Sequence, residues 1–173
     1  MAEEKKAPQR VVYVGDLGKD TSKDVILGLL GFDMESQDPI RMIVNSYGGY
    51  IDEMFAIYDA MQACRAPIGT IGIGKIMSAG VLILAAGAKG ERRMASNARV
   101  MTHELSGGVY GKLYQMETDL EGARELQRRM ERALAKTCGR KVGEIRALMD
   151  THKDTYITAA EAEAFGIVDR VVG

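Results

Sequence analysis

The sequence is poor in cysteine and in long apolar runs. Its 173 residues include 2 cysteines, Cys64 and Cys138, which lie far apart and lack the spacing of metal ligands. We therefore expect no disulfide framework, no metal site and a reducing compartment. The longest apolar run, VLILAA, is too short to span a bilayer. The opening segment, MAEEKKAPQR, lacks the apolar stretch of a signal peptide, so a cytoplasmic protein is expected.

An excess of charge of either sign is also missing. The chain has 23 basic and 24 acidic residues and a formal net charge of −1, and the charges alternate in sign rather than forming blocks. Such a surface has no electrostatic attraction toward nucleic acid or an anionic membrane. We therefore expect neither of them as a partner.

Apolar segments with the period of strands alternate with segments of helical period. RVVYV and IRMIV, which begin at Arg10 and Ile40, are short β-branched runs typical of strands. Each is followed by a segment with helical spacing, and no linker or repeat divides the chain. This order predicts one α/β domain over residues 1–173, with residues 1–10 flexible.

Two later segments carry specific predictions. Residues 91–103, ERRMASNARVMTH, predict a pair of short strands around turn residues Ser96 and Asn97. Lys112 to Cys138 is the longest segment with helical period, and its apolar residues form one stripe. A helix of this length is expected to reach beyond its own domain.

Ser78 is a candidate nucleophile. It stands among glycines and aliphatic residues in IGKIMSAGVLILAAGAKG, where a predicted strand meets an apolar helix. A hydroxyl at a helix N-terminus lies close to free N–H groups, which stabilise developing negative charge. The plainer alternative is a helix cap. The chain has 2 histidines that could act as a base, His103 and His152, and the polar setting of His152 is typical of a solvated side chain.

A second turn is a candidate part of the same site. NSYGG ends a predicted strand with Gly48 and Gly49 just before the next helix, so its backbone can approach a substrate closely. One N–H from Gly49 and one from Ala79 would form the pair of oxyanion donors that serves acyl chemistry. Taken alone, NSYGG is equally consistent with an ordinary strand-to-helix turn.

Several motifs, taken in order, resemble the family of proteolytic subunits of the Clp protease (ClpP), within the crotonase-like superfamily. The similar segments are NSYGGYIDEMFAIYDAM, SAGVLILAAGAKGERRMASNARVMTHELSGG and DTYITAAEAEAFGIVDRVV, and the resemblance spans about Val11 to Val172. It implies the repeated ββα-type superhelical fold of that family, with a protruding handle over residues 107–138. It also implies a serine endopeptidase that hydrolyses peptides and unfolded polypeptides without a cofactor.

Carried over residue by residue, the resemblance implies a triad of Ser78, His103 and Asp154. Asp150 is the alternative carboxylate because it stands close by in the sequence. Asp154 is favoured because it directly precedes the segment from Thr155, as the family's aspartate does. The other implied site residues bind the oxyanion or the substrate: Gly48, Gly49, Ala79, Gly107 and Gly108.

The same resemblance implies a homo-oligomer. Members of the family form stacked rings that enclose the active sites in a chamber, and a separate AAA+ unfoldase uses ATP to supply the substrate. The polar segment before Val11 is shorter than the N-terminal segment that builds the family's axial pore loops. Dependence on an unfoldase is therefore left open at this point.

The chain departs from the family pattern near the predicted site. Tyr47 stands where the family has proline, and Ala79 stands where methionine is common. Neither change removes a backbone N–H. Glu104 and Leu105 replace the usual Gln-Pro after the histidine, so the strand that holds an extended substrate is expected to differ in shape.

Other functions stay open on the sequence alone. An acyl-CoA hydratase or isomerase on the same scaffold would need acidic residues such as Glu53 and Glu104, and it would leave Ser78 and His103 as coincidences. A catalytically silent ring subunit would keep the fold without the activity. An enzyme with a Ser-Lys pair would need a lysine in the role of His103 or Asp154, and none is evident.

Overall fold

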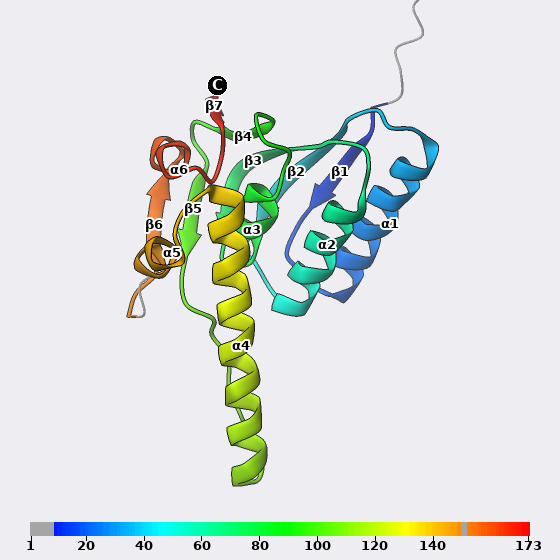
Figure 1. The fold of residues 1–173 in the computed structure, drawn as a ribbon. Coiled ribbons are helices and arrows are strands. Elements are labelled where there is room, and N and C mark those ends of the chain that lie inside the picture. Colours follow the sequence, from blue (N-terminus) through cyan, green and yellow to red (C-terminus); the bar gives the residue numbers. More distant parts are fainter. Residues whose placement is uncertain (1–8, 150–151) are drawn as a thin grey trace, which may run out of the picture.

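The computed structural model describes residues 9–149 and 152–173 (Figure 1). The strands are β1 (Val11–Val14), β2 (Ile40–Ser46), β3 (Ile68–Met77), β4 (Arg92–Ala95), β5 (Arg99–Thr102), β6 (Thr155–Thr158) and β7 (Arg170–Val172). The helices are α1 (Lys19–Glu35), α2 (Ile51–Ala63), α3 (Gly80–Ala85), α4 (Leu113–Cys138), α5 (Val142–Leu148) and α6 (Ala159–Phe165). Most of the segment predicted to be flexible, and the alternative carboxylate Asp150, lie outside the described residues.

One mixed sheet forms the centre of the fold. Its main path runs β1-β2-β3-β4-β7 with all neighbours parallel. β5 joins β3 in parallel and β6 in antiparallel orientation. Parallel neighbours need long crossover connections, and helices provide most of them. The mainly parallel sheet with its helices confirms the predicted α/β class.

The predicted pairing of the two strands within residues 91–103 is wrong. β4 and β5 both form, but each runs parallel to a different part of β3. Residues 70–72 of β3 pair with β4, and residues 75–77 pair with β5. The reason is the length of β3, whose 10 residues give room for both short strands, one after the other. As a result, β5 ends beside the carboxyl end of β3.

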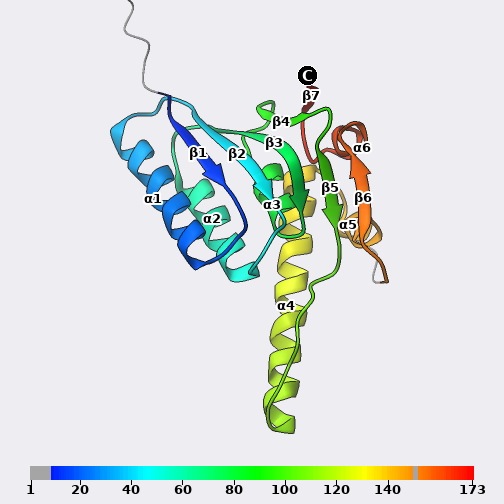
Figure 2. The ribbon, with the colours of Figure 1, turned by 180° about the vertical axis from the view of Figure 1, so that it is seen from behind.

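Helices cover one face of the sheet. In Figure 1, α1, α2 and α3 lie in front of the strands, and Figure 2 shows the opposite face without a helix in front of it. The alternation along β1 follows from this arrangement, because successive side chains of a strand point to opposite faces. Val12 and Val14 are buried, whereas Tyr13 is 55% exposed. α3 is buried along its whole length, which fixes the segment after Ser78 in the core.

α4 extends away from the sheet. Its buried residues all lie in its second half: Met130, Glu131, Leu134, Ala135 and Cys138. Leu113 and Tyr114, at its first turn, are 73% and 62% exposed. Both views show the segment after β5 running beside this helix (Figures 1 and 2). Within residues 9–149 and 152–173, neither α4 nor any other helix is long and apolar enough to cross a membrane.

Candidate active site

Ser78 occupies a sharp turn between β3 and α3. Its φ is 52°, and among the described residues it is the one non-glycine residue with a positive φ. This conformation is strained for a side chain with a Cβ atom, and it persists where surrounding contacts enforce it. One such contact is the Ser78 N–H, which donates to the carbonyl of Met101 in β5 at 2.8 Å. The turn leaves the serine half-buried, between the core and the surface.

His103 reaches Ser78 from the neighbouring strand. β3 and β5 pair in parallel with Met77 opposite Met101, so the residues after both strand ends lie close together. The Nε2 atom of His103 lies 2.8 Å from Ser78 Oγ. For Nε2 to accept the serine proton, Nδ1 must carry the proton of the neutral ring. The structure therefore brings the predicted nucleophile and the predicted base into hydrogen-bonding contact.

Asp154 stands opposite His103 when the register of β5 and β6 is extended by one residue pair. β5 and β6 are antiparallel with Thr102 opposite Thr155, so the next pair beyond the ladder is His103 with Asp154. Side chains of directly opposed residues project from the same face of a sheet. Asp154 is exposed, and among the described residues no hydrogen bond joins its carboxylate to His103. The register places this aspartate beside the histidine without forming the third contact of a triad.

The glycine turn after β2 lies against the serine. Gly48 and Gly49 have φ values of 99° and 145°, which favour glycine. A Cβ atom on Gly48 would come within 2.7 Å of the Ser78 Cβ. A Cβ atom on Gly49 would come within 2.2 Å of the carbonyl oxygen of Leu17. Both positions therefore require glycine, and the turn and the nucleophile are in close contact.

Backbone N–H groups from both turns at the site donate to no acceptor in the part of the chain that the structure describes. They include those of Gly49 and Ala79. The neighbouring N–H groups of Gly48 and Tyr50 both donate to other parts of the fold. Ala79 is buried and directly precedes α3, whose first N–H groups have no acceptor within the helix. The two predicted oxyanion donors are thus available to bind a substrate oxygen.

Gly107 and Gly108 lie in the segment between β5 and α4. Both are exposed, and a Cβ atom on either would meet no other atom within 4 Å. Packing within the subunit therefore does not require glycine at these positions. The segment is anchored closer to the histidine, where the N–H of Leu105 donates to Gln127 Oε1 of α4 at 2.9 Å.

The acidic residues that a hydratase would need are not bonded to the serine and histidine pair among the described residues. Glu53 accepts a hydrogen bond from the hydroxyl of Ser22 in α1. Glu104 is exposed, and so is His152. Among the described residues, no hydrogen bond joins the carboxylates of Glu53 and Glu104 to the serine and histidine pair.

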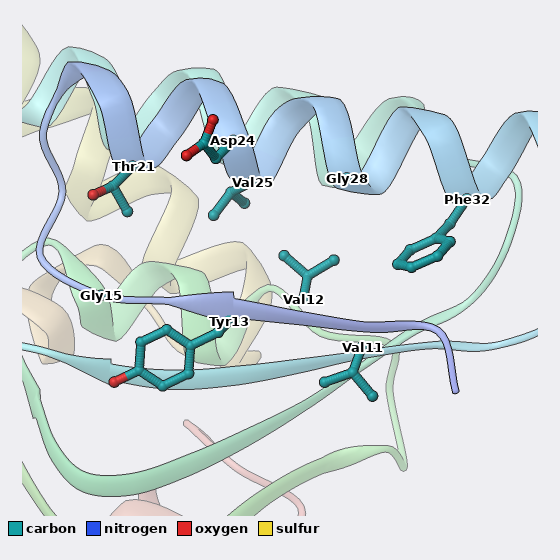
Figure 3. A pocket seen from close by; sticks show the side chains of 9 residues that line it. All are labelled: Val11, Val12, Tyr13, Gly15, Thr21, Asp24, Val25, Gly28 and Phe32. Atoms are coloured by element: carbon teal, nitrogen blue, oxygen red, sulfur yellow. The ribbon is translucent and has the colours of Figure 1, made fainter. Parts of the chain in front are cut away.

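A pocket of about 460 Å³ lies in another part of the molecule, between β1 and α1 (Figure 3). Val12, Val25 and Phe32 give it apolar walls, and Thr21 and Asp24 add polar groups. None of the predicted site residues lines it. The candidate site is therefore the surface where the turns after β2, β3 and β5 meet.

Sequence reasoning missed two features of this site. The first is the left-handed conformation of Ser78, for which the small residues Ala79 and Gly80 are a signal, because so tight a turn has room only for small neighbours. The second is the role of Leu17, whose backbone forms two hydrogen bonds with the glycine turn. No sequence pattern marks Leu17, because its contact depends on β1 lying beside β2.

Comparison with known proteins links the chain to one family. Residues 5–173 match the family model described as Clp protease. The chain is 38% identical over 168 residues to ATP-dependent Clp protease proteolytic subunit 1 of Rhodococcus jostii (strain RHA1), which covers 95% of this chain and 75% of that protein. It is 36% identical to proteolytic subunit 2 of Corynebacterium jeikeium (strain K411), over 94% of this chain and 78% of the relative. It is 37% identical to proteolytic subunit 3 of Nocardia farcinica (strain IFM 10152), over 94% and 75%.

Proposed function

We propose that Ser78, His103 and Asp154 carry out the chemistry of this chain. The chain belongs to the Clp protease family and is a Clp-type serine endopeptidase. The strongest support is the 2.8 Å contact between His103 Nε2 and the Oγ of a serine held at a φ of 52°. A partly exposed hydroxyl in contact with an imidazole is the arrangement of an activated nucleophile. The acyl-CoA chemistry considered above has no support in a chain of this family.

Hydrolysis proceeds in two steps on these residues. His103 Nε2 takes the proton of Ser78 Oγ as that oxygen attacks the scissile carbonyl, and it then protonates the leaving amine. The resulting acyl-enzyme is hydrolysed by water, which His103 activates in the same way. Asp154 accepts a hydrogen bond from the Nδ1–H group, which fixes the tautomer and stabilises the imidazolium ion. This contact needs the β5 and β6 pairing to continue by one residue pair beyond Thr102 and Thr155.

The oxyanion of the tetrahedral intermediate binds to the N–H groups of Gly49 and Ala79. These donors come from two turns in close contact, as the 2.7 Å approach of a Gly48 Cβ to Ser78 indicates. Backbone donors held in advance stabilise the developing charge without reorganising. This role is consistent with the finding that neither N–H group donates a hydrogen bond within the described part of the chain.

The substrate is an extended peptide or an unfolded polypeptide. Gly107 and Gly108 have free space where a Cβ atom would lie, so their lack of side chains serves something outside the subunit. A substrate backbone that adds alongside this segment as a strand needs that close approach. Such pairing would hold the scissile carbonyl beside Gly49 and Ala79.

A fluorophosphonate probe tests the nucleophile directly. We expect one probe per chain by intact mass, with the adduct mapped to Ser78, because phosphonylation requires a serine activated by its base. His103→Ala should slow the labelling strongly, whereas Ser106→Ala, which removes an exposed hydroxyl three residues after His103, should not. Labelling at a different serine, or none in folded wild-type protein, would favour a catalytically silent ring subunit.

We also propose that residues 107–138 form a handle through which two rings of the same chain stack. Leu113, Tyr114 and Leu120 are 73%, 62% and 44% exposed, so one subunit leaves this part of α4 uncovered. Light scattering at micromolar concentration should therefore give the mass of a large homo-oligomer. Leu120→Glu should reduce that mass toward a single ring, while the exposed neighbour variant Glu117→Gln should not. A monomeric wild type would refute the assembly.

An unfoldase partner is the remaining part of the proposal, and a cytoplasmic location stays a prediction of the sequence. Without nucleotide, we expect the purified protein to cleave short fluorogenic peptides while native folded proteins survive. The reason is that a folded substrate offers no extended strand for the site. Casein, which is unfolded, distinguishes a gated entrance from an open one. Slow cleavage of casein indicates a gated entrance that needs a separate AAA+ unfoldase. Rapid cleavage of casein without nucleotide would contradict the gated entrance.

A further inference from the structure

The turn that carries Gly49 is held by a side chain outside the site. Asp16, in the loop between β1 and α1, accepts the N–H of Tyr47 at its Oδ1 atom, at 2.7 Å. The same Oδ1 atom lies 3.5 Å from the hydroxyl of Ser46. One carboxylate oxygen therefore meets two successive residues at the start of the turn.

The backbone of the next residue, Leu17, completes the attachment. Its N–H donates to the Gly48 carbonyl at 2.7 Å, and its carbonyl accepts the N–H of Tyr50 at 2.9 Å. The N–H groups on either side of Gly49 are thus all occupied, and the Gly49 N–H alone points to no acceptor among the described residues. The loop after β1 therefore occupies one N–H on each side of Gly49 and leaves the Gly49 N–H free.

The turn also packs on the residues that follow the nucleophile. Ser46 is fully buried, and its hydroxyl accepts the Gly48 N–H at 2.9 Å. A Cβ atom on Gly80 would lie 3.3 Å from the Ser46 Cβ, so the turn and the start of α3 are in contact. A shift of the turn therefore changes the separation between the N–H of Gly49 and the N–H of Ala79.

We propose that Asp16 is a positioning residue that fixes the Gly49 N–H at the distance from Ala79 that an oxyanion requires. This inference rests on the proposed function. The residue it holds, Tyr47, has an N–H and a backbone freedom that the proline of the family pattern lacks. Asp16 satisfies that N–H and restricts that freedom. Asp16 and Tyr47 are exposed, so water can replace the bond at little cost in stability, but water does not hold the turn in place.

The test compares alanine and asparagine at this position. Asp16→Ala should lower kcat for a short fluorogenic peptide by about 10- to 100-fold, because a misplacement of about 1 Å can cost on the order of 100-fold. KM should change by less than about twofold, since the oxyanion donors bind the transition state more tightly than the substrate. Asp16→Asn keeps an oxygen acceptor and should retain most of the activity. The matched control is Asp20→Ala, which removes an exposed carboxylate from the start of α1.

A double mutant separates positioning from stability. Tyr47→Pro removes the N–H that Asp16 accepts, so Asp16→Ala made in that background should lower kcat by less than about threefold. The rate of inactivation by the fluorophosphonate should follow the same pattern, and the thermal midpoint and the oligomer mass should stay close to wild type. An equal loss of kcat in both backgrounds, or a loss that follows a fall in thermal midpoint or assembly, would overturn the positioning role.

Failure of this inference differs from failure of the proposed function. If wild type cleaves peptides and is labelled at Ser78 while Asp16→Ala is as active as Asp20→Ala, the role of Asp16 is rejected and the proposed function stands. If folded wild type neither cleaves nor is labelled, the proposed function falls, and the role of Asp16 falls with it.

Discussion

Alanine in place of Ser78 is expected to lower kcat for short peptides by on the order of 10⁵-fold or more, the scale of effect when a triad nucleophile is removed. The fold should survive, because the side chain makes its hydrogen bond to His103 and the backbone N–H that anchors the turn to Met101 is kept. Steady-state kinetics, with circular dichroism and light scattering as controls, measure both. Undiminished activity in the folded variant would reject Ser78 as the nucleophile.

The same assay assigns the other members of the triad. His103→Ala should lose about as much activity as Ser78→Ala, and the double variant should lose little more, because residues that act as a unit are not additive. Asp154→Ala should lose on the order of 10⁴-fold. Asp150→Ala is its matched control, since Asp150 is the nearby carboxylate that the sequence offered as an alternative. A larger loss in Asp150→Ala than in Asp154→Ala would reverse the assignment.

Features set by local sequence were predictable. The helix predicted from Lys112 to Cys138 forms as α4 from Leu113–Cys138, because one apolar stripe and charged flanks specify a helix whatever it packs against. The junction at Ser78 was also predictable, since β3 ends at Met77 and α3 begins at Gly80. In both cases the periodicity of neighbouring residues carries the information.

Features set by distant partners were not predictable from one sequence. The sequence predicts that β4 and β5 pair with each other, because turn residues separate them. In the structure each of them pairs with β3, which is long enough for both. The φ of Ser78 depends on the bond from its N–H to β5. Asp16 stands far from Tyr47 in the sequence, and the parallel pairing of β1 with β2 brings them together. Residue types therefore indicated which side chains to propose for the site, but they did not predict the contacts that hold these side chains.

A buried ion pair supports the largest expected effect on stability. Arg92 in β4 is 1% exposed, and its Nε donates to Asp169 Oδ2 at 2.9 Å. The same guanidinium donates to the carbonyl of Thr137 in α4 at 2.9 Å. Asp169 also accepts the backbone N–H of Gly90 at 2.7 Å. The pair thus joins β4, α4 and the segment before β7.

Asp169→Ala is expected to lower the free energy of unfolding by about 3–5 kcal/mol, because it leaves the buried guanidinium of Arg92 without a counter-charge. The hydrogen bonds from Arg92 hold the pKa of Asp169 well below its usual range. The carboxylate therefore stabilises the fold above about pH 4, the pKa region of an unfolded aspartate, and this contribution is lost as the pH falls further. Denaturant unfolding should show a gap in the free energy of unfolding between wild type and variant that is wide near neutral pH and narrows in acid.

Glu91→Ala is the matched control, because it breaks the neighbouring 2.8 Å pair with Arg93, in which the Glu91 side chain is 56% exposed. It should cost less than about 1 kcal/mol. A gap that is small at neutral pH, or unchanged by acid, would contradict the structural role of the buried pair.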